Sequence, residues 1–397
     1  MLLSHIYIGT SGWDYEDWIN VFYETDRNLF SQYARVFNTV EINSTFYSLP
    51  QKGFIEGLTR NAPKGFVFSL KLYREFTHKK LLNPKLLGES FNLFFNLISP
   101  LNERGKLGAI LIQLPPKRRE DIPWFKDFLE MLPKKYRYAI EFRDSTWLAD
   151  DVYRLLRDFN IAYTIVDEPL LPPNIILTAD FTYIRWHGRS QRPWYYYHYN
   201  LDELKDWAQK VNRIAEEVPL LLGYFNNHFR GFAPHNALQM LALLGMLDRE
   251  KRQLLIKMDK YFSSIPRETI EEAQRAVSKG SIEGILKALA GEKRFERGME
   301  ISNDMVSYRI EGSRIYGKVK EYSIAIGVSE RYIEHNCEDW RKSVEGKRFC
   351  KHMVKFFLTI PKDLSLQILE DIISNLEDWE FVAGNVESEG STRNRPS

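Results

Sequence analysis

Eight short runs of apolar and β-branched residues recur along the first 227 residues of the chain, and amphipathic segments lie between most of them. The runs cover residues 6–13, 39–47, 66–73, 108–116, 138–144, 162–168, 181–189 and 219–227, and the helical patterns cover 28–38, 85–98, 121–132, 147–159, 201–217 and 235–247. Nearly continuous apolar strands that alternate with amphipathic helices are typical of a parallel sheet buried on both faces. Eight such units within residues 1–248 predict an α/β fold, a (β/α)₈ barrel of the TIM type.

The hydrophobic pattern changes after residue 248. Segment 249–292 has helical periodicity, with Pro266 near a first turn and Gly280 as a break, so we expect a helical linker there. Short β-type runs separated by turn residues follow at 304–337 and predict a small antiparallel meander ahead of a helix at 350–358. We therefore divide the chain into a barrel at 1–248, the linker, a small α+β module at 293–384 and a disordered polar tail at 385–397.

Polar and charged residues follow the apolar run of nearly every predicted strand. In a barrel the carboxyl ends of all strands meet at one rim, where the catalytic groups of such folds lie. Charges there are costly to bury unless paired, so their recurrence favours a pocket lined by acids and bases, although strand-end salt bridges and caps would use the same residues. The candidates for catalysis are Glu41, Lys71, Glu141, Arg143, Asp167, Arg185 and His187, and those for substrate binding are Thr10, Ser11, Asn43, His78, Gln113, Arg189, Asn226 and Asn227.

The predicted rim combines carboxylates, cations and a histidine. Glu41 and Glu141 come from different sides of the rim, and two such carboxylates can act as general acid and base or hold a divalent metal. The cations supply positive charge for a phosphate or a developing oxyanion. This mixture suits hydrolysis or phosphodiester chemistry better than redox chemistry. Our hypothesis assigns the base to Glu141 or Glu41, the acid to His187, and anion binding to the cations Lys71, Arg143 and Arg185.

Several well-known catalytic motifs are missing from the sequence. The chain has no P-loop, no G-x-G-x-x-G dinucleotide fingerprint and no G-x-S-x-G elbow. The residues 9–12, Gly-Thr-Ser-Gly, follow the first predicted strand and would offer backbone N–H groups to an anion, and a plain tight turn explains them equally well.

Charge and hydropathy narrow the class of protein further. The formal net charge is only +2 over 397 residues, so an anionic partner must meet a local basic patch. No apolar run reaches the ~18 residues of a membrane span, and the N-terminal segment lacks the basic region of a signal peptide. The two cysteines have metal-ligand spacing, which fits a reducing compartment. We expect a cytoplasmic protein with no membrane partner, and the sequence does not indicate its oligomeric state.

Both cysteines belong to one short palindrome of metal ligands. His335-x-Cys337 is followed, after twelve residues, by Cys350-x-His352. Two thiolates and two imidazoles form a complete tetrahedral set for Zn²⁺, with no position left for a substrate. The spacing therefore predicts a structural zinc site in the C-terminal module.

The segment around the second pair of ligands is rich in cations. Residues 341–355 contain six Lys and Arg and a single acid, Glu345. A loop and helix of this composition suit the phosphate backbone of DNA or RNA, and an ordinary solvated surface has a similar composition. The predicted nucleic-acid-binding residues are Arg341, Lys342, Lys347, Arg348, Lys351 and Lys355.

Seven ordered motifs in the N-terminal part resemble the domain-of-unknown-function 72 family, the YecE-like barrels, over about residues 5–248. They are GTSGW at 9–13, VEINSTFY at 40–47, FSLKLYREFTH at 68–78, QLPP at 113–116, EFRDSTW at 141–147, WHGR at 186–189 and YFNNHFRGFAPHNA at 224–237. The resemblance implies a TIM-like barrel and does not supply a settled activity.

The C-terminal module resembles the SWIM zinc finger, which has a short sheet, a C-x-C pair, a loop and a C-x-H pair that enters a helix. The likeness runs from about residues 297–298 through 332–340 to 349–358, and His335 stands where the family has its first cysteine. An imidazole is an acceptable zinc ligand, so the resemblance still implies a closed site. SWIM modules imply binding to nucleic acid or protein.

Together these patterns favour a nucleic-acid-directed hydrolase that cleaves phosphodiesters, with a divalent metal at Glu41 and Glu141 and a finger that binds the substrate. One alternative is a barrel enzyme for a small phosphorylated or glycosidic substrate, with the finger used for docking to a protein. The other is a non-catalytic module that binds nucleic acid or protein.

Overall fold

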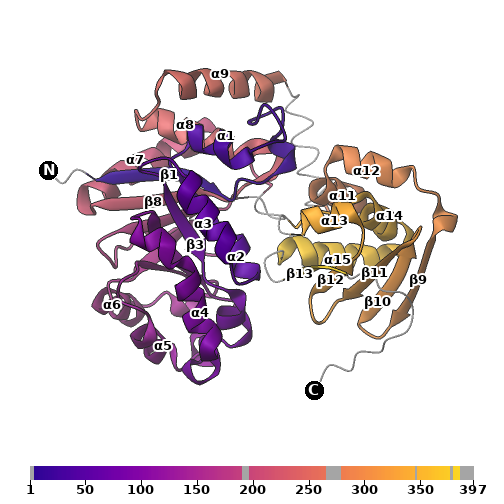
Figure 1. The fold of residues 1–397 in the computed structure, drawn as a ribbon, viewed down its shortest axis with the longest axis horizontal. Helices are drawn as coiled ribbons and strands as arrows, with labels where there is room; N and C mark the ends of the chain where they lie inside the picture. The colour runs from indigo at the N-terminus through magenta and orange to yellow at the C-terminus, as the bar shows by residue number, and fades with distance from the viewer. Residues whose placement is uncertain (1–3, 190–195, 265–278, 345–346, 376–378, 385–397) are drawn as a thin grey trace. The chain divides into compact units, whose positions relative to one another are not determined.

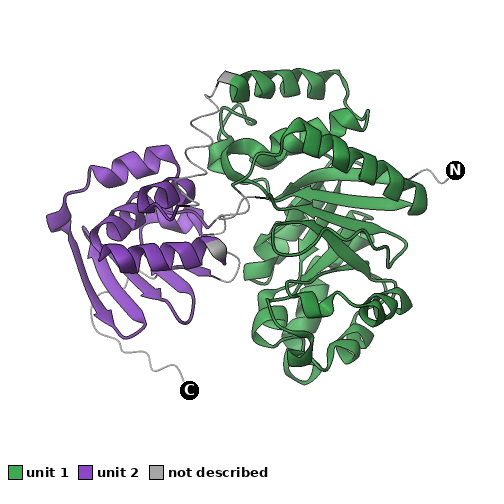
Figure 2. Cartoon of the chain, turned by 180° about the vertical axis from the view of Figure 1, so that it is seen from behind, with its two compact units in different colours: residues 1–271 green, residues 272–397 purple. Residues whose placement is uncertain are grey.

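The computed structural model describes residues 4–189, 196–264, 279–344, 347–375 and 379–384 (Figure 1). The chain forms two compact units, residues 1–271 and 272–397 (Figure 2). The predicted linker 249–292 is divided between these units, and its part from 265 to 278, like the predicted tail, lies outside the described residues. In the described part, no helix is both long and apolar enough to cross a membrane.

The first unit is a closed barrel of eight parallel strands, in which β1 pairs with both β2 and β8. The strands are β1 His5–Ser11, β2 Thr39–Ile42, β3 Val67–Lys71, β4 Leu107–Gln113, β5 Tyr138–Glu141, β6 Ala162–Asp167, β7 Thr182–Trp186 and β8 Leu220–Phe225. Each predicted strand is present, so the prediction of a TIM-like barrel is confirmed. Nearly every strand residue is buried, because helices and connecting segments cover the outside of the barrel (Figure 1).

The helices of the first unit include all six predicted for the barrel and three more. The predicted ones are α1 Leu29–Val36, α4 Pro84–Glu103, α5 Phe125–Met131, α6 Asp150–Asp158, α7 Leu201–Glu217 and α8 Phe232–Leu243. Helices α2 Ser44–Tyr47 and α3 Lys52–Asn61 were not predicted, whereas α9 Arg249–Ser264 lies in the segment predicted as a helical linker. Helix α9 packs on α8, which explains why α8 is buried on nearly all sides.

Large and small side chains alternate inside the barrel and fill it below the polar rim. Two tyrosines from β7 and β8, Tyr183 and Tyr224, pack with a tilted ring contact at 5.2 Å, and alanines on neighbouring strands leave room for them. The Tyr224 hydroxyl shares hydrogen bonds of 2.8 Å with Thr39 and Ser69. The cluster consists of Ala109, Leu111, Ala139, Ala162, Phe181, Tyr183, Leu222 and Tyr224. This apolar layer lies directly below the polar residues of the rim.

The second unit combines a five-stranded sheet with five described helices. The strand order is β13-β12-β11-β10-β9, with β9 Val306–Glu311, β10 Arg314–Val319, β11 Tyr322–Gly327, β12 Tyr332–His335 and β13 Glu380–Ala383. The helices are α11 Ile282–Ala290, α12 Glu292–Met299, α13 Glu338–Ser343, α14 Lys351–Thr359 and α15 Lys362–Ser374. The predicted meander and the helix at 350–358 are confirmed. Strand β13, which pairs parallel to β12, was not predicted.

Candidate functional site

The centre of the barrel mouth is a buried arginine between two carboxylates. Arg185 on β7 has no exposed side-chain surface. Its Nη2 donates to Glu41 Oε1 at 2.8 Å, and its Nη1 donates to Glu141 Oε2 at 2.6 Å. The two acids come from β2 and β5, so closure of the barrel is what brings these three side chains together. A buried charge in such a setting is tolerated because it is paired and hydrogen-bonded.

Glu41 accepts two further hydrogen bonds besides the one from Arg185. Ser11 Oγ donates to Oε1 at 2.7 Å, and the Tyr183 hydroxyl donates to Oε2 at 2.7 Å. Burial and the charge of Glu41 raise the pKa of Tyr183 well above its usual value, so the phenol keeps its proton and remains a donor. Tyr183 was missed in the sequence, although it lies two residues before Arg185 and therefore on the same face of the strand.

Glu141 is held in the ionised form by two guanidinium groups. Its Oε1 pairs with Arg143, whose Nη1 donates to Glu168 Oε2 at 2.9 Å. Burial acts to raise the pKa of Glu141, but the charges of Arg143 and Arg185 outweigh it and hold the pKa well below the usual range. Glu141 is therefore a carboxylate at neutral pH and a poor proton donor.

His187 lies against Glu141 and is neutral in this setting. Asn226 Nδ2 lies 2.9 Å from His187 Nδ1, and His187 Nε2 lies 3.4 Å from Glu141 Oε1. Burial and the neighbouring charge of Arg185 lower the pKa of His187 to about 4, against the raising effect of Glu141. The role of His187 as an acid stays a prediction, and its lowered pKa leaves the imidazole neutral at neutral pH.

A lysine from β3 joins the same network through a glutamine. Lys71 Nζ donates to Gln113 Oε1 at 2.9 Å and lies 4.1 Å from the centre of the Phe46 ring. The same Gln113 oxygen lies 3.4 Å from Arg185 Nη1. His78 packs edge-on against Phe46 at 5.0 Å, which places it beside this end of the network.

The remaining predicted rim residues mostly bind neighbouring elements. Asp167 accepts three hydrogen bonds from Arg189 and one from the Trp207 indole at 2.6 Å, which ties β6 to α7. Thr10 contacts the Tyr33 hydroxyl of α1 at 2.9 Å. Asn227 donates to Tyr197 O and to Asn236 Oδ1, both at 2.8 Å. The Oδ1 atom of Asn43 is buried without a hydrogen-bond partner.

The predicted divalent-metal site at Glu41 and Glu141 is not supported. The Arg185 guanidinium occupies the position between the two carboxylates and already neutralises them. A metal ion there would have to displace a buried cation and would be repelled by Arg143. Across the described ranges, the one group of three or more His, Cys, Asp or Glu side chains that can hold a metal ion lies in the second unit.

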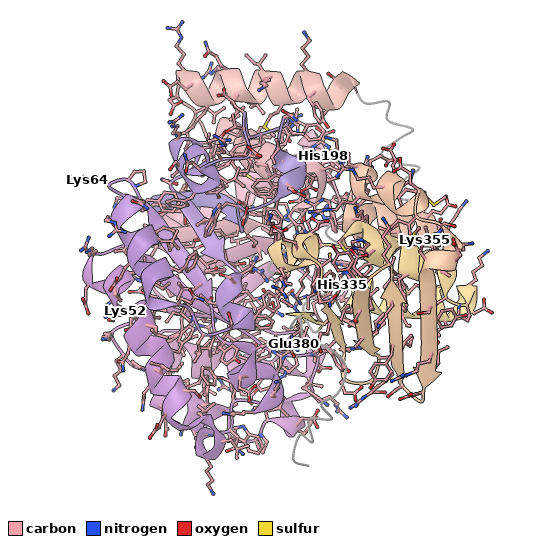
Figure 3. All side chains as sticks on the ribbon, turned by 45° about the vertical axis from the view of Figure 1, so that its right-hand side comes forward. Lys52, Lys64, His198, His335, Lys355 and Glu380 are labelled. Atoms are coloured by element: carbon pink, nitrogen blue, oxygen red, sulfur yellow. The ribbon has the colours of Figure 1, made fainter. Side chains whose placement is uncertain are left out.

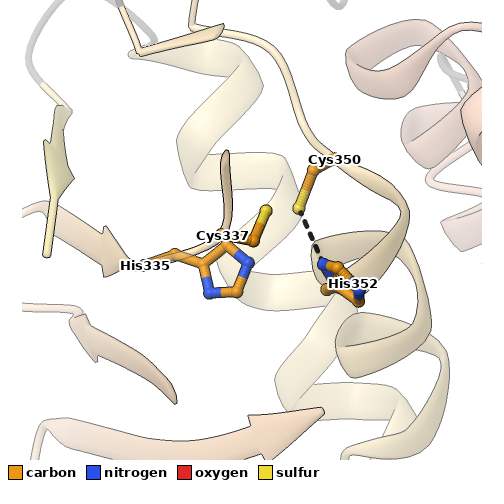
Figure 4. Close-up of side chains that lie close together, drawn as sticks. All are labelled: His335, Cys337, Cys350 and His352. Carbon is orange, nitrogen blue, oxygen red and sulfur yellow. Dashed lines mark hydrogen bonds between the residues drawn. The ribbon is translucent and has the colours of Figure 1, made fainter. Parts of the chain in front are cut away.

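That group consists of the four predicted ligands, all of which are buried. The side chains of His335, Cys337, Cys350 and His352 each offer a ligand atom, and these atoms lie within 4.8 Å of one another (Figure 4). His335 ends β12, Cys337 and Cys350 are the N-cap residues of α13 and α14, and His352 lies in the first turn of α14. The fold thus presents four donor atoms to one point.

The surroundings orient these donors toward a cation. His335 Nδ1 lies 2.7 Å from the Ser323 carbonyl and donates to it, so Nε2 carries the lone pair, and this buried Nε2 has no hydrogen-bond partner. A hydrogen bond of this kind commonly fixes the tautomer of a metal-bound histidine. The backbone N–H of Trp340 donates to Cys337 Sγ at 3.2 Å, and the thiol of Cys350 lowers the pKa of Cys337. The donor set fits a metal that prefers sulfur and nitrogen.

The predicted basic surface beside this cluster is smaller than expected. Lys347 is buried and donates to Trp379 O at 2.5 Å, and Lys355 (Figure 3) is buried as well, so the prediction that both lie on an exposed surface is wrong. Arg341 and Lys342 are exposed, Arg348 and Lys351 are half-buried, and Lys342 pairs with Glu338 at 2.8 Å. Residues 293–384 contain 15 Lys and Arg against 16 Asp and Glu, so the module as a whole is not basic.

The pH dependence of stability tests the environment of His187. The pKa of His187 is about 4 in the folded chain and 6.5 without its surroundings, so the unfolded chain binds more protons between these values. Stability is then complete above the unfolded pKa and is lost as the pH falls toward 4. We expect His187→Gln to reduce the loss of unfolding free energy between pH 7 and pH 5 by about 2 kcal/mol.

Urea unfolding of both proteins at these two pH values measures the difference. His198 is another buried histidine, with a pKa lowered to about 3. It is present in both proteins, so its contribution to the pH dependence is the same in both. If the unfolding free energy of His187→Gln has the same pH dependence as that of the wild type, the lowered pKa of His187 is wrong.

Metal analysis tests the cluster in the second unit. We expect one transition-metal ion per chain, and a cobalt-loaded protein should show the sulfur-to-cobalt absorption band because two thiolates bind the ion. Cys350→Ser should lose the metal and unfold the second unit, whereas His5→Gln, which changes an exposed histidine outside the cluster, should keep both. Metal-free wild-type protein with a folded second unit would refute the site.

Comparison with known proteins agrees with the barrel. A family model described as "Protein of unknown function DUF72" matches residues 7–258. UPF0759 protein YunF of Bacillus subtilis is 28% identical over 270 residues, which is 60% of this chain and 94% of that protein. UPF0759 protein YecE of Escherichia coli K12 is 28% identical over 232 residues, which is 52% of this chain and 80% of that protein.

Two crystal structures of DUF72 family proteins share the fold. One from Thermotoga maritima has a TM-score of 0.56 at 32% identity and covers 60% of this chain and 99% of that chain. One from Enterococcus faecalis has a TM-score of 0.54 at 23% identity and covers 62% of this chain and 97% of that chain, a likeness of fold alone. The matched family residues end before the second unit begins at residue 272. The chain therefore belongs to the DUF72 family, whose barrel forms its first unit.

Proposed function

We propose that the first unit is a cytoplasmic hydrolase that cleaves phosphodiesters in nucleic acid at the carboxyl end of its barrel. The observation that carries this proposal is the convergence of the rim residues on one hydrogen-bonded network around Arg185. Each of the eight strands, or the residues directly after it, contributes to this network: Ser11, Glu41, Lys71, Gln113, Glu141, Arg143, Glu168, Arg185, His187 and Asn226. Such convergence at the carboxyl ends of barrel strands is where catalytic groups are found.

The accessible part of the network favours an anionic substrate. The side chain of Arg143 is 10% exposed, whereas those of Glu141, Arg185 and His187 have no exposed surface. A substrate phosphate would therefore meet Arg143 first, and Arg185 would act below it by fixing Glu41 and Glu141. Arginine binds phosphate oxygens with two parallel hydrogen bonds, which suits this role.

The proton-transfer group of the proposed reaction is His187, which Glu141 orients. In the substrate-free protein burial, and after it the positive charges of Arg185 and Arg143, lower the pKa of His187 and keep the imidazole neutral, so it can accept a proton. A bound phosphate would offset these positive charges and raise the pKa of His187 toward neutrality, because a nearby negative charge favours the protonated form. The proposal reverses the acid role that the sequence alone had assigned to this residue.

We further propose that the metal of the second unit is Zn²⁺ in a structural site of the SWIM type. Two thiolates and two imidazoles complete the tetrahedral coordination of zinc and leave no open position. Binding would contribute on the order of 10 kcal/mol to the folding of this unit. The exposed cations Arg341 and Lys342 would then act as the contact with nucleic acid.

A second candidate function follows from the charge of the module. Lys347 and Lys355 are buried and the module carries no excess of cations, which favours docking to a protein over binding to a polyanion. The barrel would then act on a small phosphorylated substrate. A glycosidic substrate fits less well, because glycosidases need one carboxylic acid as proton donor and both acids here are paired with Arg185. If the protein turns over no substrate, the alternative of a non-catalytic binding module would be favoured.

Hydrolysis assays on full-length protein test the proposal. We expect cleavage of single-stranded DNA or RNA oligonucleotides, and we expect His187→Ala to lower kcat/KM by about 10²–10⁴-fold. Arg143→Ala should mainly raise KM, because Arg143 contacts the substrate. Arg213→Ala, which removes an exposed cation of α7, is the matched control and should leave the activity unchanged.

The second candidate is distinguished in the same assays. Turnover of small phosphate esters without oligonucleotide cleavage would favour it. Equal activity of wild type and His187→Ala on every substrate would contradict both enzymatic proposals.

A further inference from the structure

The exposed apolar side chains in the described part of the second unit lie close together in the sequence, inside or shortly before strand β9. Among residues described between 279 and 384, the large hydrophobic side chains with high exposure are Met299 at 52%, Met305 at 47%, Tyr308 at 41% and Ile310 at 46%. All four fall within twelve positions of the chain, next to or inside β9. A concentration of this kind marks an interaction surface, whereas isolated exposed apolar residues are ordinary.

Within the described residues of the second unit, β9 is an edge strand of the sheet with a neighbour on one side only. It is the last strand in the sheet order and pairs antiparallel with β10 (Figure 1). The register pairs Val306 with Val319, so Lys320 lies opposite Met305, and Lys320 N donates to Met305 O at 2.8 Å. Because hydrogen-bonded pairs alternate along an antiparallel ladder, the backbone groups of residues 306, 308 and 310 point away from β10.

The side chains of the same three residues lie on one face of the sheet. Tyr308 packs edge-on toward Phe356 of α14 at 6.5 Å, so Val306, Tyr308 and Ile310 lie on the face that the helices cover. Ser307, Arg309 and Glu311 lie on the opposite face. The edge therefore offers unpaired backbone groups and uncovered apolar side chains at the same positions, which are the two requirements for adding another strand.

We propose that this edge pairs with β9 of a second copy of the chain, antiparallel and about a two-fold axis at Tyr308. In this register Val306 lies opposite Ile310 of the second copy, and Tyr308 lies opposite its own counterpart. Ser307 lies opposite Arg309 of the second copy on the other face. The outward backbone groups of residues 306, 308 and 310 all find partners, and a continuous sheet of ten strands results.

Several neighbouring registers fit the strand less well. If the register shifts by one residue, the outward backbone groups of one β9 face backbone groups of the other β9 that are already bonded to β10. The shift also places apolar side chains opposite polar ones. Centring the axis on Arg309 places the two guanidinium groups opposite each other, and like charges at opposed positions destabilise a sheet. The self-complementary order of residues 306–310 is what points to a second copy as the partner.

Disulfide trapping tests the register directly. Opposed residues in a hydrogen-bonded antiparallel pair have Cα atoms about 5.5 Å apart, within the range of a disulfide. Tyr308→Cys should therefore form a covalent dimer under mild oxidation. Arg309→Cys is the matched control, because its counterpart lies two residues out of register, and it should stay largely uncrosslinked. The native Cys337 and Cys350 are buried and present in both variants.

The assembly itself is measured by sedimentation of the full chain over a wide range of concentration. Wild type should reach about twice the monomer mass of 46.9 kDa. Ile310→Lys should shift the protein to monomer with unchanged thermal unfolding, whereas Ile256→Lys, at an isoleucine of α9 that is 61% exposed, should still dimerise. A wild-type chain that stays monomeric at every concentration, or equal crosslinking of the two cysteine variants, would overturn the proposal.

Discussion

The ion-pair network around Arg185 is the interaction on which the first unit depends. A guanidinium without exposed surface costs several kcal/mol to bury, and only close, well-oriented partners offset this cost. Glu41 and Glu141 provide them from two other strands at 2.8 and 2.6 Å, which is possible only when the barrel is closed. The same contacts hold Glu141 in the ionised form, and Glu41 is paired with Arg185 and accepts two further hydrogen bonds. On this geometry we base the proposal that the barrel binds an anionic substrate and that His187 is the proton-transfer group.

The architecture and the metal cluster were readable from the sequence because both rest on local periodicity or spacing. Alternation of apolar strands and amphipathic helices is imposed by a sheet buried on both faces, and it predicted all eight strands. The two ligand pairs around Cys337 and Cys350 were recognisable because a tetrahedral site needs four donors, and short spacings supply two at a time. The structure adds the orientation of His335, which a hydrogen bond to a carbonyl twelve residues away determines.

Other features could not be read from local patterns, because they depend on partners far along the chain. Strand β13 has four residues and is stabilised by pairing with β12, some fifty positions earlier. In the sequence Lys347 looks like a surface cation, yet its ammonium group is buried and donates a hydrogen bond to the Trp379 carbonyl. At the rim, the sequence indicated which charged residues follow the strands, but it did not indicate how these residues pair. The sequence shows that Glu41 and Glu141 end strands and does not show that Arg185 lies between them.

The central claim is that Arg185 and its carboxylates act as one energetic unit, and a double-mutant cycle measures this most directly. The unfolding free energies of wild type, Arg185→Met, Glu41→Gln and the double variant give the coupling between the two side chains. We predict that the double variant loses less stability than the sum of the single variants, with a coupling of about 1–3 kcal/mol. Additive losses, with no measurable coupling, would contradict the account.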